Sequence, residues 1–237
     1  MAAQLKLGDT TVHVILKDIK NVHLSVYPPT GRVRISAPSR MDLNTIRAFA
    51  ISKLGWIRRQ QKQIGAQERE WPRAYVERET HYVWGRRYLM QVREGARSGV
   101  ELKHDAIILC QRKGACMTRR HEIMQDWYRQ QLKDAIPELQ RKWAARMGVS
   151  PTSIGVRRMK TMWGSCSPDR GAIRINLELV KKPRECLEYI LVHELAHLLE
   201  HTHNNRFIAH MDRLLPDWRH RRDELNRLPV PHEDWIY

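Results

Sequence analysis

The chain has 237 residues, 42% of them hydrophobic, and this length suits one domain or a close pair. Its 42 Lys and Arg against 26 Asp and Glu give a net charge of +16, which attracts polyanions such as nucleic acid or acidic proteins. The start MAAQLKLGDTT lacks a secretory-leader pattern, no run approaches the ~20 apolar residues of a membrane span, and the four cysteines form no CxxC pair. We therefore expect a cytoplasmic protein with reduced thiols and no membrane partner.

The first part of the chain is expected to be rich in β-structure. Residues 11–37 alternate apolar and polar side chains around a turn at 28–31, which predicts a β-hairpin or the start of a meander. Asp42 precedes an amphipathic pattern that predicts one helix to about Gln63. Residues 65–72 are polar, and two further strands are predicted at 81–92 and 100–110. Residues 1–112 are thus expected to form a β-rich N-terminal region with one helix.

Residues 113–237 are expected to form a second region. Helical periodicity covers 117–146, where Pro137 predicts a kink or a break, and Gly148 with Pro151 closes this segment. A turn at 164–171 and a half-buried strand at 172–180 follow. Pro183 is suited to the first turn of the next helix, and the end from Leu228 is expected to be a docked or frayed tail.

That next helix carries the pattern H-E-x-x-H as His193, Glu194 and His197. Two residues four positions apart on a helix lie about 40° apart in projection and one turn apart along the axis, so both imidazoles can reach one tetrahedral ion. Glu194 is turned away from the ligand line but remains beside the metal, where a carboxylate can deprotonate a zinc-bound water. The pattern predicts a zinc-dependent hydrolase with Zn²⁺ as its cofactor.

A catalytic zinc usually takes three protein ligands, so a third is needed. His201 on a continued helix would stand about 12 Å from His193 along the axis, too far to share the ion. His203 lies next to Asn204-Asn205, a sequence suited to ending a helix in a left-handed residue and turning the chain back, so we predict His203. A downstream acid, Glu224 or Asp212, is the weaker alternative.

The chain resembles the YgjP-like and SprT-like zinc metallopeptidases. The resemblance lies in residues 162–167 (Met-Trp-Gly-Ser-Cys-Ser), the strand 173–177, Pro183 and residues 189–207, and it extends to 31–38, Trp56-Ile57 and 79–88. It implies an α+β fold, with a small β-rich N-terminal half followed by a zincin-like catalytic half in which the HExxH helix packs on a β-sheet. It also implies a three-histidine zinc site and peptidase activity on a protein or peptide substrate.

The turn at 163–167 is expected near the metal cleft, where Trp163, Gly164 and Ser165 are candidate substrate contacts; a purely structural role for the turn is an equal alternative. Cys166 is expected to be a small buried hydrophobe.

Two other functional classes compete with a peptidase. Endoribonucleases of the YbeY kind carry histidines at a similar spacing, H-x-x-x-H-x5-H, and the basic charge of this chain suits an RNA substrate. Those enzymes, however, have glycine where this chain has Glu194. A non-catalytic module in which zinc only stabilises the fold would be expected to have a closed set of four ligands rich in cysteine, which this segment lacks. Recruitment of a protease by DNA or by a nucleic-acid complex is also compatible with the charge.

Overall fold

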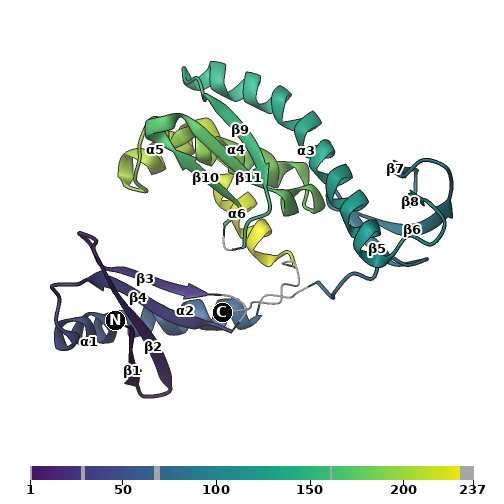
Figure 1. Ribbon diagram of the computed structural model, residues 1–237. Helices are drawn as coiled ribbons and strands as arrows, with labels where there is room; N and C mark the ends of the chain where they lie inside the picture. The colour runs from purple at the N-terminus through teal and green to yellow at the C-terminus, as the bar shows by residue number, and fades with distance from the viewer. Residues whose placement is uncertain (1, 28–29, 67–69, 161, 230–237) are drawn as a thin grey trace. The chain divides into compact units, whose positions relative to one another are not determined.

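The computed structural model describes residues 2–27, 30–66, 70–160 and 162–229, and these divide into two compact units. The first runs to Ala66 and the second from Glu70 to Pro229 (Figure 1). Both contain sheets and helices, so the α+β class is confirmed. No helix among the described residues combines the length and the apolar character needed to cross a bilayer.

The first unit is a four-stranded sheet with two helices. Its strands are β1 (Ala2–Leu7), β2 (Thr10–Lys17), β3 (His23–Tyr27) and β4 (Arg32–Pro38), in the order β1-β2-β4-β3. An antiparallel pair, β3-β4, does flank the predicted turn, but the predicted strand at 12–16 belongs to β2, which pairs with β4 in parallel. The unit is therefore neither the expected hairpin of these two runs nor a meander. This register sets buried Val12 and Val14 of β2 opposite Val33 and Ile35 of β4, and one face of the sheet becomes a continuous apolar core.

Two helices cover that core, α1 (Leu43–Ser52) and α2 (Leu54–Ala66), where the sequence predicts one. Asp42 caps α1 as expected, since its carboxylate accepts from the backbone N–H groups of residues 44 and 45 at 2.8 and 3.0 Å. The break falls at Lys53, two residues before Gly55, a residue with low helix propensity. Ile46 and Ile57, one from each helix, are fully buried in this core, so both helices follow the apolar pattern despite the break.

The second unit opens with another four-stranded sheet, made of β5 (Thr80–Val83), β6 (Arg86–Glu94), β7 (Gly99–Leu102) and β8 (Ala106–Gln111), in the order β5-β6-β8-β7. Each of the two predicted strands is therefore split by a tight turn. This sheet shares a core with the helices that follow, as Met90 and Leu109 pack with Met124 and Leu132. The units consequently divide between 66 and 70 rather than at the predicted 112/113, because the sheet buries its apolar face against the helical part.

Helix α3 (Met117–Met147) matches the predicted helix at 117–146, and Gly148 ends it in the left-handed conformation with φ +68°. It does not break at Pro137. A proline costs an internal hydrogen bond, but Leu132, Ile136 and Trp143 bury the helix on both sides of it. Packing therefore outweighs the local cost.

A three-stranded sheet and three helices complete this unit: β9 (Ser153–Arg157), β10 (Gly164–Ser167), β11 (Ala172–Asn176), α4 (Arg184–Ala196), α5 (Asn205–Leu214) and α6 (Trp218–Arg227). The sheet has the order β10-β11-β9, which makes β10 an edge strand. Two predictions need correction: residues 164–167 form a strand rather than a turn, and β11 ends at Asn176, after which Leu177–Lys181 is a 3-10 helix. Pro183 directly precedes α4. The expected tail from Leu228 lies outside the described residues beyond Pro229.

The β5-β6 hairpin is fixed against the segment before α4. At its tip Trp84 has φ +50° and Gly85 φ +78°, and their N–H groups donate to the carbonyls of Val180 (2.7 Å) and Lys181 (3.3 Å). A Cβ on Gly85 would lie 3.0–3.3 Å from atoms of Pro183, two of them backbone. This position therefore needs glycine for its backbone angle and for the space.

Gly85→Ala should destabilise the protein more than Gly114→Ala. Both residues have left-handed backbone angles (φ +78° and +77°), but a Cβ at Gly114 meets nothing within 4 Å. We expect about 1 kcal/mol lost at Gly114 and a further 1–3 kcal/mol at Gly85 from overpacking on Pro183. Urea unfolding curves of the two variants measure the difference, and equal losses would contradict the close docking.

Candidate metal centre

Three histidines come together where α4 meets the segment that leads to α5. The candidate ligand nitrogens of His193, His197 and His203 all lie within 4.8 Å of one another. The ring centres are 4.7–5.0 Å apart, and Nε2 of His203 is 2.9 Å from Nε2 of His193. Metal–imidazole bonds are about 2.0–2.1 Å long, so small side-chain rotations would place the three nitrogens around one ion. The set has the size and the chemistry of a metal site.

The chain between the second and third histidines turns back earlier than the sequence suggests. Helix α4 ends at Ala196, and His197 is its C-cap in right-handed geometry. Asn204 has φ −86° and caps the start of α5, accepting from the N–H groups of Arg206 (2.9 Å) and Phe207 (3.1 Å). The predicted helix end in a left-handed residue at 203–205 is therefore wrong, although the predicted return of His203 occurs. His201, in the intervening loop, lies outside the histidine cluster.

Phe207 packs against all three histidines. Its ring centre lies 4.9 Å from that of His193, 4.7 Å from that of His197 and 4.8 Å from that of His203, and the side chain is only 2% exposed. An apolar residue in this position limits ring movement and excludes water from one side of the cluster. Sequence reasoning did not assign this role; the signal was the asparagine cap three residues earlier, which fixes the phenylalanine on the first turn of α5.

The imidazoles are held in states suited to binding a cation. Nδ1 of His197 faces the backbone oxygen of Glu200 at 3.2 Å, which leaves its Nε2 for the cluster. Burial, and then the neighbouring His197 and His203, lower the pKa of His193 to about 3. His193 is consequently neutral near pH 7, as a metal ligand must be. Its Nδ1 is buried and has no hydrogen-bond partner among the described residues.

Glu194 is buried beside this cluster, with 5% of its surface exposed. Burial raises its pKa to about 8, and a cation nearby would lower it again. Strand β10 lies directly against it: a Cβ on Gly164 would be 2.5 Å from Oε1 and 2.8 Å from Cγ of Glu194, and 2.8 Å from Ile190 Cγ2. Glycine at this position therefore lets the strand approach the carboxylate.

The other candidate residues have different surroundings. Trp163 is half-buried and packs on the core of the second unit, with Lys182 Nζ 6.0 Å from its ring centre. Burial, and then the charge of Glu194, raise the pKa of Cys166 to about 11, so its thiol is protonated near pH 7. Asp212 accepts from Trp218 Nε1 at 2.8 Å, and neither it nor Glu224 belongs to the histidine cluster. Trp163 and Gly164 thus have structural roles that do not require a substrate.

Comparison with known proteins identifies the family. The chain matches the family described as YgjP-like, metallopeptidase domain, over residues 20–228. The chain belongs to this family. Family membership implies a metal, and the three histidines provide a set of side chains that fits one.

A search of the curated proteins finds no match. Among solved structures, the crystal structure of the metallopeptidase zymogen of Pyrococcus abyssi abylysin is similar to part of this chain, with 24% identity and a TM-score of 0.36. The similarity covers 40% of this chain and 99% of that one.

His203→Ala should weaken divalent-metal binding at least tenfold, whereas His201→Ala should change it less than threefold. His203 joins the cluster and His201 lies outside it. Dissociation constants measured by competition with a chromophoric chelator check this. A larger loss in the His201 variant would show that the loop adopts a different path.

Gly164→Ala should destabilise the protein by about 1–3 kcal/mol, because the added methyl overpacks the side chains of Glu194 and Ile190. Gly155→Ala is the matched control, since its Cβ on β9 of the same sheet meets nothing within 4 Å. Chemical unfolding of both variants measures the difference. A Gly164 variant as stable as the control would contradict the close packing of β10 on α4.

Proposed function

We propose that this protein is a zinc metallopeptidase in which His193, His197 and His203 bind the ion and Glu194 is the general base. The observation that supports this best is the gathering of three imidazoles beside one buried carboxylate. Membership of a metallopeptidase-domain family agrees with it. The packing of α4 on β10 and β11 supports a zincin-like arrangement of the catalytic half.

Zinc suits this donor set better than harder cations do. Magnesium and calcium prefer oxygen ligands, whereas imidazole nitrogens suit zinc and other first-row metals. Within the part of the chain that the structure describes, the cluster has three side chains and no cysteine, which is typical of a catalytic site with an open position rather than of a structural site. When bound, zinc supplies a Lewis acid that acidifies water and polarises the scissile carbonyl.

Glu194 would do the proton chemistry. Its carboxylate follows the first ligand directly in sequence, and it is shielded from bulk solvent by β10. In its ionised form it accepts the proton of the attacking water and then returns that proton to the leaving amine nitrogen. Burial strengthens its interaction with both groups, because competing water is excluded.

The edge strand β10 is suited to hold the substrate. It pairs with β11 on one side, and an extended peptide can add to the free edge of a sheet through main-chain hydrogen bonds. Such a peptide would lie near Gly164 and Ser165, next to Glu194. Trp163 would then act by fixing the start of the strand rather than by binding the peptide directly.

Glu194→Gln should retain metal binding and folding but lose hydrolysis by a factor of 10² or more, because glutamine keeps the shape and cannot accept the proton. Glu185→Gln, the same change at an exposed position on α4, is the control and should remain active. Metal content, thermal unfolding and turnover of a fluorogenic peptide library are compared in identical buffer.

Unchanged turnover in the Glu194 variant would remove it as the base. If the unmodified protein cleaves RNA in a metal-dependent way and no peptide, the endoribonuclease alternative replaces the peptidase proposal. If the metal recovered from the purified protein is not zinc at about one ion per chain, the assignment of zinc fails.

A further inference from the structure

The sheet of the first unit has one face that the core does not use. Along β2 and β4 the side chains alternate, with Val12, Val14, Val33 and Ile35 completely buried against the helices. The side chains between them point to the opposite face, and on β1 Gln4 and Lys6 do the same. A sheet with one covered face normally leaves the other to water or to a ligand.

The charged side chains of this open face are all basic. The four strands contain no Asp or Glu, whereas they carry Lys6, Lys17, Arg32 and Arg34. Residues 1–69 as a whole have twelve Lys and Arg against four Asp and Glu, a net charge of +8. Residues 70–237 share the remaining +8 over 168 positions, so the positive charge is more than twice as dense in the first unit. The face therefore complements a polyanion.

The register brings polar groups into line across this face. Gln4 lies opposite His13, His13 opposite Arg34, and Arg34 opposite Ser25, so one row crosses all four strands. Tyr27 lies opposite Arg32 in the adjoining row. Neighbouring strands are about 4.8 Å apart, so such a row presents several hydrogen-bonding groups within reach of one extended ligand.

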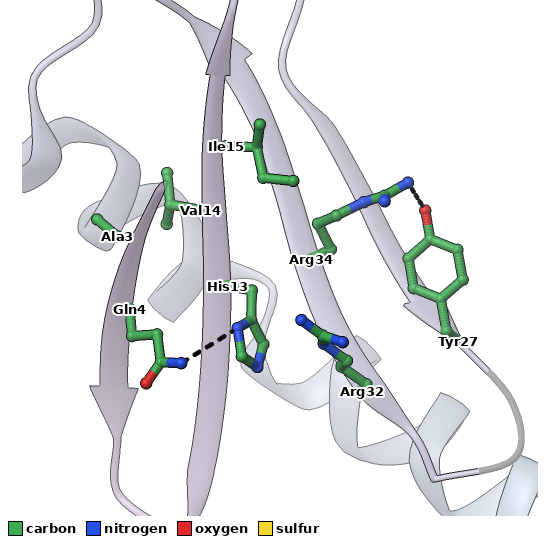
Figure 2. A pocket seen from close by; sticks show the side chains of 8 residues that line it. All are labelled: Ala3, Gln4, His13, Val14, Ile15, Tyr27, Arg32 and Arg34. Carbon is green, nitrogen blue, oxygen red and sulfur yellow. Dashed lines mark hydrogen bonds between the residues drawn. The ribbon is translucent and has the colours of Figure 1, made fainter. Parts of the chain in front are cut away.

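A depression of 620 Å³ is lined by Gln4, His13, Tyr27, Arg32 and Arg34 from these two rows (Figure 2). Arg34 donates to the hydroxyl of Tyr27, and its guanidinium carbon lies 4.5 Å from the centre of the Tyr27 ring. Gln4 Nε2 lies 3.4 Å from Nδ1 of His13. Burial, and then the charge of Arg32, lower the pKa of His13. Ala3, Val14 and Ile15 also border the depression, although the side chains of Ala3 and Val14 pack in the core on the other face.

We propose that this face binds single-stranded nucleic acid, with Arg32 and Arg34 on the phosphates and the neighbouring Tyr27, His13 and Gln4 in reach of the bases. Arginine forks suit phosphate oxygens, while an aromatic ring and amide or imidazole groups contact exposed bases. An acidic peptide needs only positive charge for binding, whereas this groove also offers an aromatic ring and hydrogen-bonding groups, and these suit nucleotide bases. The proposal is independent of the metal centre.

The test is fluorescence anisotropy of a fluorescein-labelled oligo(dT) and oligo(U), titrated with the full chain over a range of salt concentrations. Arg32→Ala/Arg34→Ala should weaken binding at least tenfold and reduce the slope of log K against log salt by about 1.4, the value for two lost phosphate contacts. Arg58→Ala/Arg59→Ala is the control, because it removes the same charge from exposed positions on α2. It should change affinity less than threefold.

Several results would overturn the proposal: equal weakening in the two double variants, no binding by the unmodified protein at 50 mM salt, or equally strong competition by a mononucleotide or by polyglutamate. If the Arg32/Arg34 variant fails to fold, ultraviolet cross-linking of the unmodified protein to oligo(dT) decides the question. Cross-linked peptides should map to β1–β4, and cross-links confined to the second unit would refute the site.

Discussion

The close approach of strand β10 to helix α4 is the constraint on which the candidate site depends. A methyl group on Gly164 would overlap Glu194 and Ile190, so the strand reaches the helix only because this position has no side chain. The approach covers the carboxylate and also sets an edge strand beside it. One glycine thus determines both the burial of the proposed base and the position of the proposed peptide-binding edge.

The second constraint is the short loop between α4 and α5. Helix α4 supplies two histidines one turn apart, but a helix cannot supply a third to the same ion. In this chain α4 ends at Ala196 and α5 begins at Asn205, so the loop between them can bring back a third histidine. The Asn204 cap fixes where α5 begins. The same cap places Phe207 against the three imidazoles, so the arrangement of the histidines and their packing come from one local feature.

The sequence predicted what depends on local pattern. The helix that carries His193 and His197, the length of α3 and the Asp42 cap follow from periodicity and capping. The return of His203 was also predicted, but from a left-handed helix end that the structure does not contain. The sequence did not predict the strand pairings and the shared core, which depend on residues far apart in the chain. Strand β10 is short and contains Gly and Ser, so only its pairing with β11 makes it a strand. The parallel pairing of β2 with β4 likewise depends on side chains far apart in sequence. The boundary between the units lies between 66 and 70 instead of at the predicted 112/113, because the β5–β8 sheet and α3 share one core.

Glu70, in a polar stretch that predicted no structure, shows the same dependence. It forms ion pairs with Lys181 at 3.1 Å and Lys182 at 3.8 Å, directly before α4, and Lys181 also pairs with Glu178 at 2.6 Å. Burial alone would lower the pKa of Lys181, but the Glu178 and Glu70 carboxylates raise it above its ordinary value. Breaking such a buried pair costs about 3–5 kcal/mol, because a charge is left without a partner. The hairpin tip bonds to the same segment through Gly85. The start of the second unit and its hairpin are therefore attached to the residues that precede the helix carrying His193 and His197, and this fixes where that helix begins.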